Sequence, residues 1–118
     1  MIDLDHFQEK CYEVSKKREQ NGAAIKVNSE GILKHCATEV IEAIQAYTEM
    51  ECYRQSLKPG ALDSGFLDNY VTRYEDELAD IIVCALVAAE CSGLEMEPAI
   101  RRCYRKNRNR ADHKGDKL

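Results

Sequence analysis

Apolar side chains recur at helical spacing through most of this chain. From Leu4 onward they lie three or four residues apart, as they do along one face of an α-helix. The same period returns in two longer stretches and, more weakly, near the C-terminus. No stretch alternates strictly between apolar and polar residues, so no strand is predicted. We expect four helices, at about residues 4–20, 29–57, 68–91 and from Pro98 to a frayed end between 107 and 110.

Turn-forming residues separate these four segments. Asn21-Gly22 ends the first, Pro59-Gly60 ends the second, and Ser92-Gly93 ends the third. Ser29 is expected to cap the second helix, because its hydroxyl can accept a hydrogen bond from a free backbone N–H of the first turn. Pro98 suits the first turn of the fourth helix, where no backbone donor is needed.

The third helix contains a stretch, Ile81–Ala89, in which every residue is apolar. A helix that is apolar on all sides has to be covered on all sides. Either its own chain wraps around it or a second subunit covers part of it. We therefore expect an all-α fold, a four-helix bundle-like subunit that forms a homodimer or homotetramer. Residues 1–118 form a single domain with a basic, disordered tail from about residue 111.

Net charge, cysteine spacing and the length of apolar runs exclude several classes of function. The formal net charge is −4, which argues against a general nucleic-acid-binding protein, although residues 101–118 are strongly basic. The six cysteines show no CxxC spacing and the N-terminus does not resemble a signal peptide, so free thiols in a cytoplasmic protein are expected. The longest apolar run, Ile81–Ala89, is too short to span a membrane.

Two acidic pairs stand out because each lies within an apolar helical segment. Glu39 and Glu42 are three residues apart, and so are Glu77 and Asp80; the chain has no other acidic pair at this spacing. Residues three apart on a helix point to one side. Buried carboxylates are costly unless they are protonated or bind a cation, so the pairs predict a divalent metal held between two helices.

The alternative interpretation is two helices with solvated acidic edges. In the metal interpretation, the neighbouring apolar side chains are expected to face a core. These side chains are Val40, Ile41, Ile44, Leu78, Ile81 and Ile82.

The order of these segments resembles the MazG-like all-α nucleoside triphosphate pyrophosphohydrolases. Residues 32–47, ILKHCATEVIEAIQAY, resemble the family's ExxE helix, and residues 75–89, EDELADIIVCALVAA, resemble its ExxD helix. Asn107-Arg108-Asn109-Arg110 with His113-Lys114-Gly115 resembles its basic C-terminal motif. The chain departs from the pattern at Thr38, Cys84 and Cys103, and its interval of 34 residues between Glu42 and Glu77 is long.

The resemblance implies hydrolysis of a nucleoside triphosphate to the monophosphate and pyrophosphate, with Mg²⁺ or Mn²⁺ as cofactor. The metal ligands and catalytic carboxylates would be Glu39, Glu42, Glu77 and Asp80. In the alternative, one of the glutamates does not bind the metal and orients or deprotonates the attacking water.

Phosphate oxygens would be bound by Lys106, Asn107 and Arg110, either in their own subunit or across an interface; the guanidinium of Arg110 can meet phosphate oxygens in pairs. The alternative for this tail is an ordinary solvated basic end. Tyr47 and Tyr74 either stack on a base or only pack between helices.

Two other functions remain open at this point. Phosphoribosyl-ATP pyrophosphohydrolases share the acidic helices, so the base and sugar of the substrate are not determined. A helical adaptor without catalytic activity, which binds a partner through its basic tail, would show no metal dependence and a steep salt dependence.

Overall fold

The computed structural model describes residues 2–58, 60 and 65–112, and this part of the chain is entirely helical or irregular, with no strand. Its helices are α1 (Leu4–Gln20), α2 (Ser29–Ser56), α3 (Phe66–Cys91) and α4 (Met96–Ala111). The all-α class and the number of helices are therefore confirmed for these residues. The expected fraying between residues 107 and 110 is wrong, because α4 stays helical to Ala111. The predicted tail motif at His113-Lys114-Gly115 lies outside the described residues.

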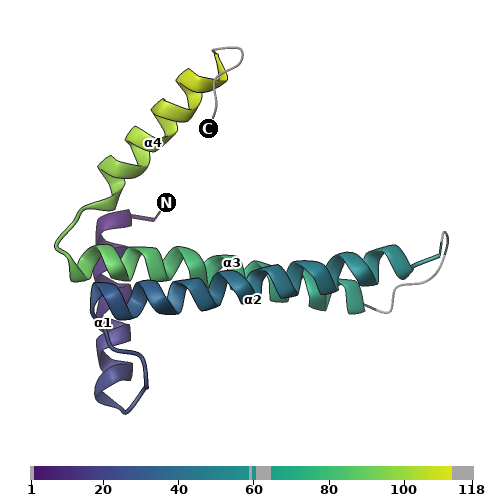
Figure 1. Ribbon diagram of the computed structural model, residues 1–118, viewed down its shortest axis with the longest axis horizontal. Helices are drawn as coiled ribbons and strands as arrows, with labels where there is room; N and C mark the ends of the chain where they lie inside the picture. Colours follow the sequence, from purple (N-terminus) through teal and green to yellow (C-terminus); the bar gives the residue numbers. More distant parts are fainter. Residues whose placement is uncertain (1, 59, 61–64, 113–118) are drawn as a thin grey trace.

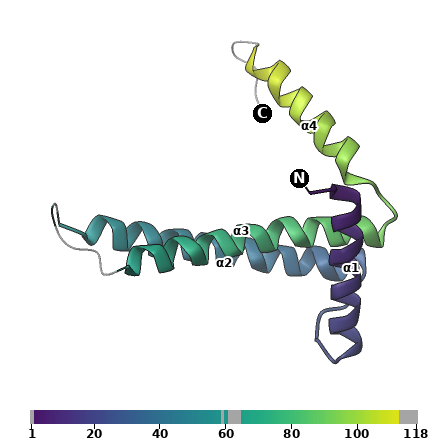
Figure 2. The same ribbon diagram turned by 180° about the vertical axis from the view of Figure 1, so that it is seen from behind.

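The long helices α2 and α3 run antiparallel, side by side, and α1 crosses them near one end (Figures 1 and 2). The last helix, α4, leaves the same end and projects away from the pair. The four helices of one chain thus do not close into the bundle that the sequence led us to expect. The radius of gyration is 18.2 Å, whereas a compact chain of this length has about 13–14 Å. The isolated chain is an open structure.

The core lies where α1 crosses the α2–α3 pair. Val27, Ile32, Cys84, Val87 and Ala88 are buried there. Around them pack half-buried apolar side chains: Cys11, Tyr12, Ile25, Cys36, Val83 and Cys91. Burial of this cluster, at roughly 25 cal/mol for each Å² of apolar surface, is the main force that holds α1 against the hairpin.

The α2 N-terminus differs from the expectation in one residue. Asn28, not Ser29, is the N-cap: its side-chain oxygen accepts a hydrogen bond of 2.7 Å from the backbone N–H of Gly31. Ser29 is instead the first helical residue, and its hydroxyl donates to the carbonyl oxygen of Ala88, at 3.2 Å. It also hydrogen-bonds Ser92, so the start of α2 is tied to the end of α3.

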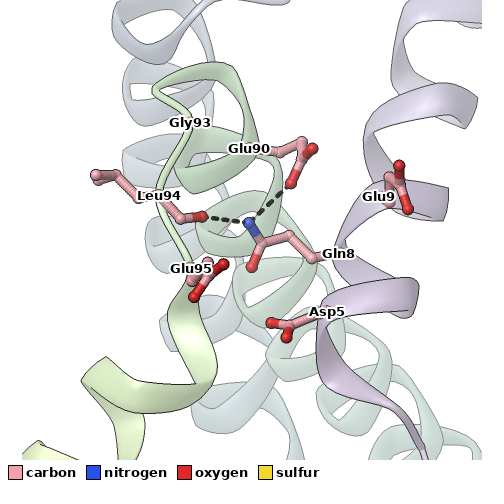
Figure 3. Close-up of a pocket in the computed structure, with 7 residues that line it drawn as sticks. All are labelled: Asp5, Gln8, Glu9, Glu90, Gly93, Leu94 and Glu95. Carbon is pink, nitrogen blue, oxygen red and sulfur yellow. Dashed lines mark hydrogen bonds between the residues drawn. The ribbon is translucent and has the colours of Figure 1, made fainter.

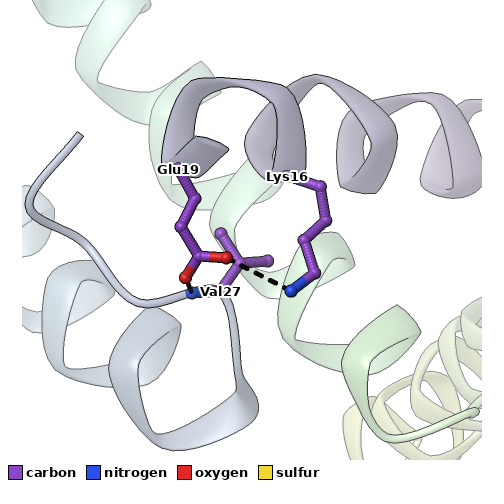
Figure 4. A network of polar contacts seen from close by, with 3 residues as sticks. All are labelled: Lys16, Glu19 and Val27. Carbon is purple, nitrogen blue, oxygen red and sulfur yellow. Dashed lines mark hydrogen bonds and ion pairs between the residues drawn. The ribbon is translucent and has the colours of Figure 1, made fainter. Parts of the chain in front are cut away.

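Glu19, near the end of α1, holds the connection from α1 to α2 (Figure 4). Its carboxylate accepts a hydrogen bond of 2.6 Å from the backbone N–H of Val27 and pairs with the Lys16 ammonium at 3.2 Å. The Val27 hydrogen bond and the Lys16 charge lower the pKa of Glu19. This contact fixes the chain just before α2, the helix that carries the first acidic pair.

The apolar neighbours of the acidic pairs do not face the core of the chain, which corrects the expectation. Ile41 and Ile82 are 57% and 60% exposed, Ile44 is 60% exposed, and Val40 and Leu78 are each 41% exposed. Of the expected set only Ile81 is half-buried. Within the apolar stretch that ends at Ala89, burial is nearly complete only from Leu86 onward.

Several of these side chains line one shallow groove of about 300 Å³ along α2 and α3, which we call the apolar groove. It consists of Val40, Ala43, Ile44, Tyr47, Tyr74, Leu78 and Ile81. The rings of Tyr47 and Tyr74 pack on each other with centroids 5.6 Å apart. The two tyrosines therefore contact each other between the helices, as the packing interpretation expected.

Candidate metal centre

The predicted acidic residues converge in the middle of the α2–α3 pair. Glu39 and Glu42 lie one helical turn apart on α2, and Glu77 comes from the facing turn of α3. One carboxylate oxygen from each of these three residues lies within 4.8 Å of the other two. Glu39 is buried and 7% exposed, whereas Glu42 and Glu77 are half-buried. The structure therefore brings three of the four predicted ligands together.

Asp80, the fourth predicted ligand, lies beside this triad and is not part of it. Its side chain is exposed, but its negative charge contributes to the raised pKa of Glu39. It also lines the same cleft as Glu39. Asp80 therefore adds negative charge beside the triad without joining it.

The electrostatics of the triad are unfavourable without a cation. Burial raises the pKa of Glu39 to about 7, and the charge of Glu42, a hydrogen bond with Glu77 and the charges of Asp80 and Glu77 add to the effect. One oxygen of Glu39 and one of Glu77 are buried without a hydrogen-bond partner in the part of the chain that is described. Unpaired buried carboxylate oxygens are costly. They fit a hard divalent cation, which takes oxygen ligands.

His35 is a functional candidate that the sequence analysis did not single out. Its Nε2 lies 2.8 Å from Oε1 of Glu39, one turn along α2. This contact holds one oxygen of the carboxylate, and the second oxygen, Oε2, is buried without a hydrogen-bond partner among the described residues. The signal was present in the sequence as a His–Glu pair four residues apart, a spacing that places two side chains in contact on a helix.

A cleft of about 270 Å³ opens next to the triad, between α1 and the α2–α3 pair. Its walls combine apolar side chains with polar ones. They are Ser15, Arg18, Ile25, Ile32, His35, Glu39, Asp80, Val83, Cys84 and Val87. Arg18 brings a positive charge from α1 to the rim of an otherwise acidic site, and no property of the sequence alone indicated it. Burial raises the pKa of Cys84 to about 11, so its thiol stays neutral at physiological pH.

The predicted phosphate ligands lie elsewhere in the chain. Lys106, Asn107 and Arg110 are on the outer half of α4, which projects away from the α2–α3 pair (Figure 1). Lys106 and Asn107 are exposed, and the Asn107 amide contacts Sγ of Cys103 at 3.7 Å. The structure thus does not bring these residues to the acidic triad of their own chain. The basic residues of α4 reach a triad only if that triad belongs to another chain or if α4 moves.

Two further observations bear on the class of protein. None of the helices in the described ranges has a segment that is both long and apolar enough to cross a bilayer. All six cysteines are free thiols, as expected. Searches of family models, of curated proteins and of solved structures found no match to this chain.

Proposed function

We propose that this protein is a MazG-like, Mg²⁺-dependent nucleoside triphosphate pyrophosphohydrolase. The observation that carries the proposal is the triad of Glu39, Glu42 and Glu77, whose oxygens lie within 4.8 Å of one another on two facing helices. Two of those residues have buried oxygens without a partner, which a surface ion pair or a solvated edge would not produce. Mn²⁺ has the same preference for oxygen and is the natural substitute.

Each residue of the site has a role in this proposal. Glu39, Glu42 and Glu77 would hold the metal, and His35 keeps the Glu39 carboxylate in position through its 2.8 Å contact. A bound Mg²⁺ supplies positive charge for phosphate oxygens and acidifies a bound water. Asp80 lies at the open side, where its carboxylate can orient a water or hold a second ion. The cleft beside the triad has room for part of a nucleotide, with Arg18 at its edge.

The reaction is tested by product analysis. Purified protein is incubated with a panel of ribo- and deoxyribonucleoside triphosphates and with phosphoribosyl-ATP, with Mg²⁺, Mn²⁺ or EDTA, and pyrophosphate and orthophosphate are measured separately. We expect metal-dependent release of pyrophosphate and a monophosphate. If phosphoribosyl-ATP is the only compound of the panel that is hydrolysed, the protein is instead a phosphoribosyl-ATP pyrophosphohydrolase. Primary release of orthophosphate, or activity that survives EDTA, would contradict the proposed reaction.

The matched variants for this assay both lie on α2. Glu42→Gln removes a charge from the triad, whereas Glu30→Gln removes one from an exposed pair with Lys34, four residues away. Removal of a metal ligand should abolish turnover, and the Glu30 variant should keep nearly all of it. Similar activities of the two variants would show that the triad is not the catalytic centre.

The active form in this proposal is a homodimer or a homotetramer. The apolar groove and the exposed Ile41 and Ile82 leave a large apolar surface uncovered, and single chains seldom expose such surfaces without a partner. Ile44 of the groove lies about 160° around α2 from Glu42, so a partner that covers Ile44 leaves Glu42 accessible. Closed symmetry is the usual solution for such a face.

In the dimer, Lys106, Asn107 and Arg110 would bind the phosphates of a substrate held by the other chain. The distance of the outer half of α4 from its own triad supports this arrangement. Glu42→Gln chains are expected to be inactive alone and Arg110→Ala chains to be slow. Mixing the two then raises activity to about one quarter of the wild-type value, because half of the dimers are mixed and each has one intact site. No recovery after verified chain exchange would contradict the arrangement in trans.

We place the protein in the cytoplasm, where free thiols persist.

A helical adaptor is the second candidate, and one observation favours it. Residues 101–109 of α4 are all exposed, so this basic face of the helix is accessible to a partner in the part of the chain that is described. Under this function the thermal melting temperature does not respond to Mg²⁺. Under the leading proposal, Mg²⁺ raises it, because a ligand that binds only the folded state stabilises that state.

A further inference from the structure

A second acidic site, which shares no residue with the triad, lies where α1, the end of α3 and the start of α4 meet (Figure 3). It is a pocket of about 260 Å³, which we call the junction pocket. Its lining consists of Asp5, Gln8, Glu9, Glu90, Gly93, Leu94 and Glu95. Four of these seven residues are acidic and none is basic. The proposed hydrolase activity uses none of them.

Gln8 is the unusual residue of this pocket. It is only 2% exposed, and its Nε2 donates to Oε2 of Glu90 at 2.9 Å and to the carbonyl oxygen of Leu94 at 2.7 Å. Both partners are acceptors, so the amide cannot be turned around without placing oxygen against oxygen. Its Oε1 must therefore point the other way, and it has no hydrogen-bond partner among the described residues. In Figure 3 this oxygen points toward the side where Asp5 and Glu95 lie.

The side chains around this oxygen offer acceptors but no donor. The carboxylates of Asp5, Glu9 and Glu95 accept hydrogen bonds when they are ionised and cannot satisfy another acceptor. None of the four pocket acids belongs to an ion pair within the described ranges; the nearby Arg101 is paired with Glu97 at 2.9 Å. The pocket also lies at the C-terminal end of α3, where no basic residue occupies the last turn, and it includes Glu95, the N-cap of α4.

These features select one kind of ligand. A group that satisfies Oε1 of Gln8 and neutralises the acids has to be a cation, and an ammonium or guanidinium group supplies N–H donors together with the charge. A small metal ion fits less well, because the pocket acids do not form a group of three with ligand atoms within 4.8 Å, as the triad does. We infer that the junction pocket binds an ammonium or guanidinium group, donated by a polyamine or by a lysine or arginine side chain of a second copy of this chain.

The binding is tested by NMR on the full ¹⁵N-labelled protein. The side-chain amide of Gln8 and the backbone amides of Leu94 and Glu95 are followed during titration with spermidine, and separately with NaCl and MgCl₂ at matched ionic strength. We expect saturable shifts of these signals with spermidine and only small, unsaturated shifts with the two salts. Equal shifts with NaCl, or tighter saturation of these signals by Mg²⁺, would overturn the inference.

Substitutions at exposed acids test spermidine binding without disturbing the fold, because exposed side chains contribute little to the core. The double substitution Asp5→Asn with Glu95→Gln should weaken spermidine binding by about tenfold, as expected from the loss of charge-assisted hydrogen bonds. Glu49→Gln, which removes an exposed carboxylate paired with Arg73 in the second half of α2, should change it by less than about twofold. An unchanged affinity in the double variant would overturn the assignment of the pocket.

A dilution series separates the two sources of the cation. If a second copy supplies the group, the Gln8 signals shift with protein concentration in the absence of spermidine, and the double variant self-associates more weakly. If the source is a small molecule, dilution leaves these signals in place. Catalytic activity is not read in these experiments, so their failure leaves the proposed hydrolase function intact, and the reverse also holds.

Discussion

Replacing Glu39 with glutamine tests the electrostatics of the triad directly. The substitution Glu39→Gln keeps the size of the side chain and an oxygen that can accept from His35, but it removes the charge. Burial is the main reason why the pKa of this carboxyl is raised, from an ordinary value of 4.5 to about 7. The change therefore removes a buried charge that opposes folding at neutral pH.

The magnitude follows from the size of the pKa change. At 1.36 kcal/mol for each pH unit, a rise from 4.5 to about 7 costs the metal-free folded protein about 3 kcal/mol when the carboxyl is ionised. Because the folded protein holds the proton more tightly than the unfolded chain, the wild type loses stability as pH rises from about 4.5 to 7. Above pH 7 the cost is complete, and below pH 4.5 it is absent.

The glutamine variant has no such dependence on pH. We therefore expect it to be more stable than the wild type at pH 8 by about 3 kcal/mol, or roughly 10 °C in melting temperature for a chain of this size. The difference should shrink through pH 6 and vanish near pH 4.5. Thermal and urea unfolding in EDTA, at one protein concentration, measure it. Glu30→Gln serves as the control, since its exposed carboxylate should give less than about 1 kcal/mol at any pH.

Metal addition reverses the order of stability. Saturating Mg²⁺ stabilises the wild type by preferential binding to the folded state, and it should stabilise the glutamine variant much less. A variant that is less stable than the wild type at pH 8 in EDTA would refute the reasoning, because it would mean that the Glu39 charge is already compensated. A stability difference that does not change with pH would refute it as well.

Three further outcomes are expected. Asp80→Asn should lower turnover at least tenfold while the metal-free melting temperature stays the same or rises, because it relieves repulsion within an acidic group; steady-state kinetics and calorimetry check both parts. Arg110→Ala should slow pyrophosphate release more than it weakens binding of the monophosphate product, which single-turnover kinetics and equilibrium titration separate. Ile44→Asp should shift the protein toward a 13.4 kDa monomer in analytical ultracentrifugation, whereas Val14→Asp, at an equally exposed position of 60% on α1, should leave the assembly unchanged.

The local structure of the chain was predictable because its signals are local. Asn21-Gly22 and Ser92-Gly93 stop helices through backbone preferences that need no distant contact. The four helices accordingly begin and end within a few residues of the expected positions. The cap of α2 is the exception. Asn28 and Ser29 can both cap a helix, and the contact of Ser29 with Ala88, 59 residues away, decided between them.

The candidate centre was predictable in part for the same reason. A spacing of three residues determines that Glu39 and Glu42 share one side of a helix, whatever the rest of the chain does. Two such pairs on an antiparallel hairpin can then meet, and three of the four carboxylates do. Which acid stays at the rim was not determined by spacing, since it depends on how the two helices are rotated against each other. Asp80 lies outside the triad for that reason.

Helical period determines which residues share a face, but it does not say what that face meets. Ile44 and Ile82 were expected in the core of the chain, and they lie on its surface because α1 and α4 pack elsewhere. The direction of α4, and with it the distance between Arg110 and the triad, depends on the few residues that follow α3. Contacts between elements distant in sequence, such as Gln8 with Glu90, arise only from packing, so the tertiary structure alone decided where the second acidic pocket lies and which surfaces remain for a partner.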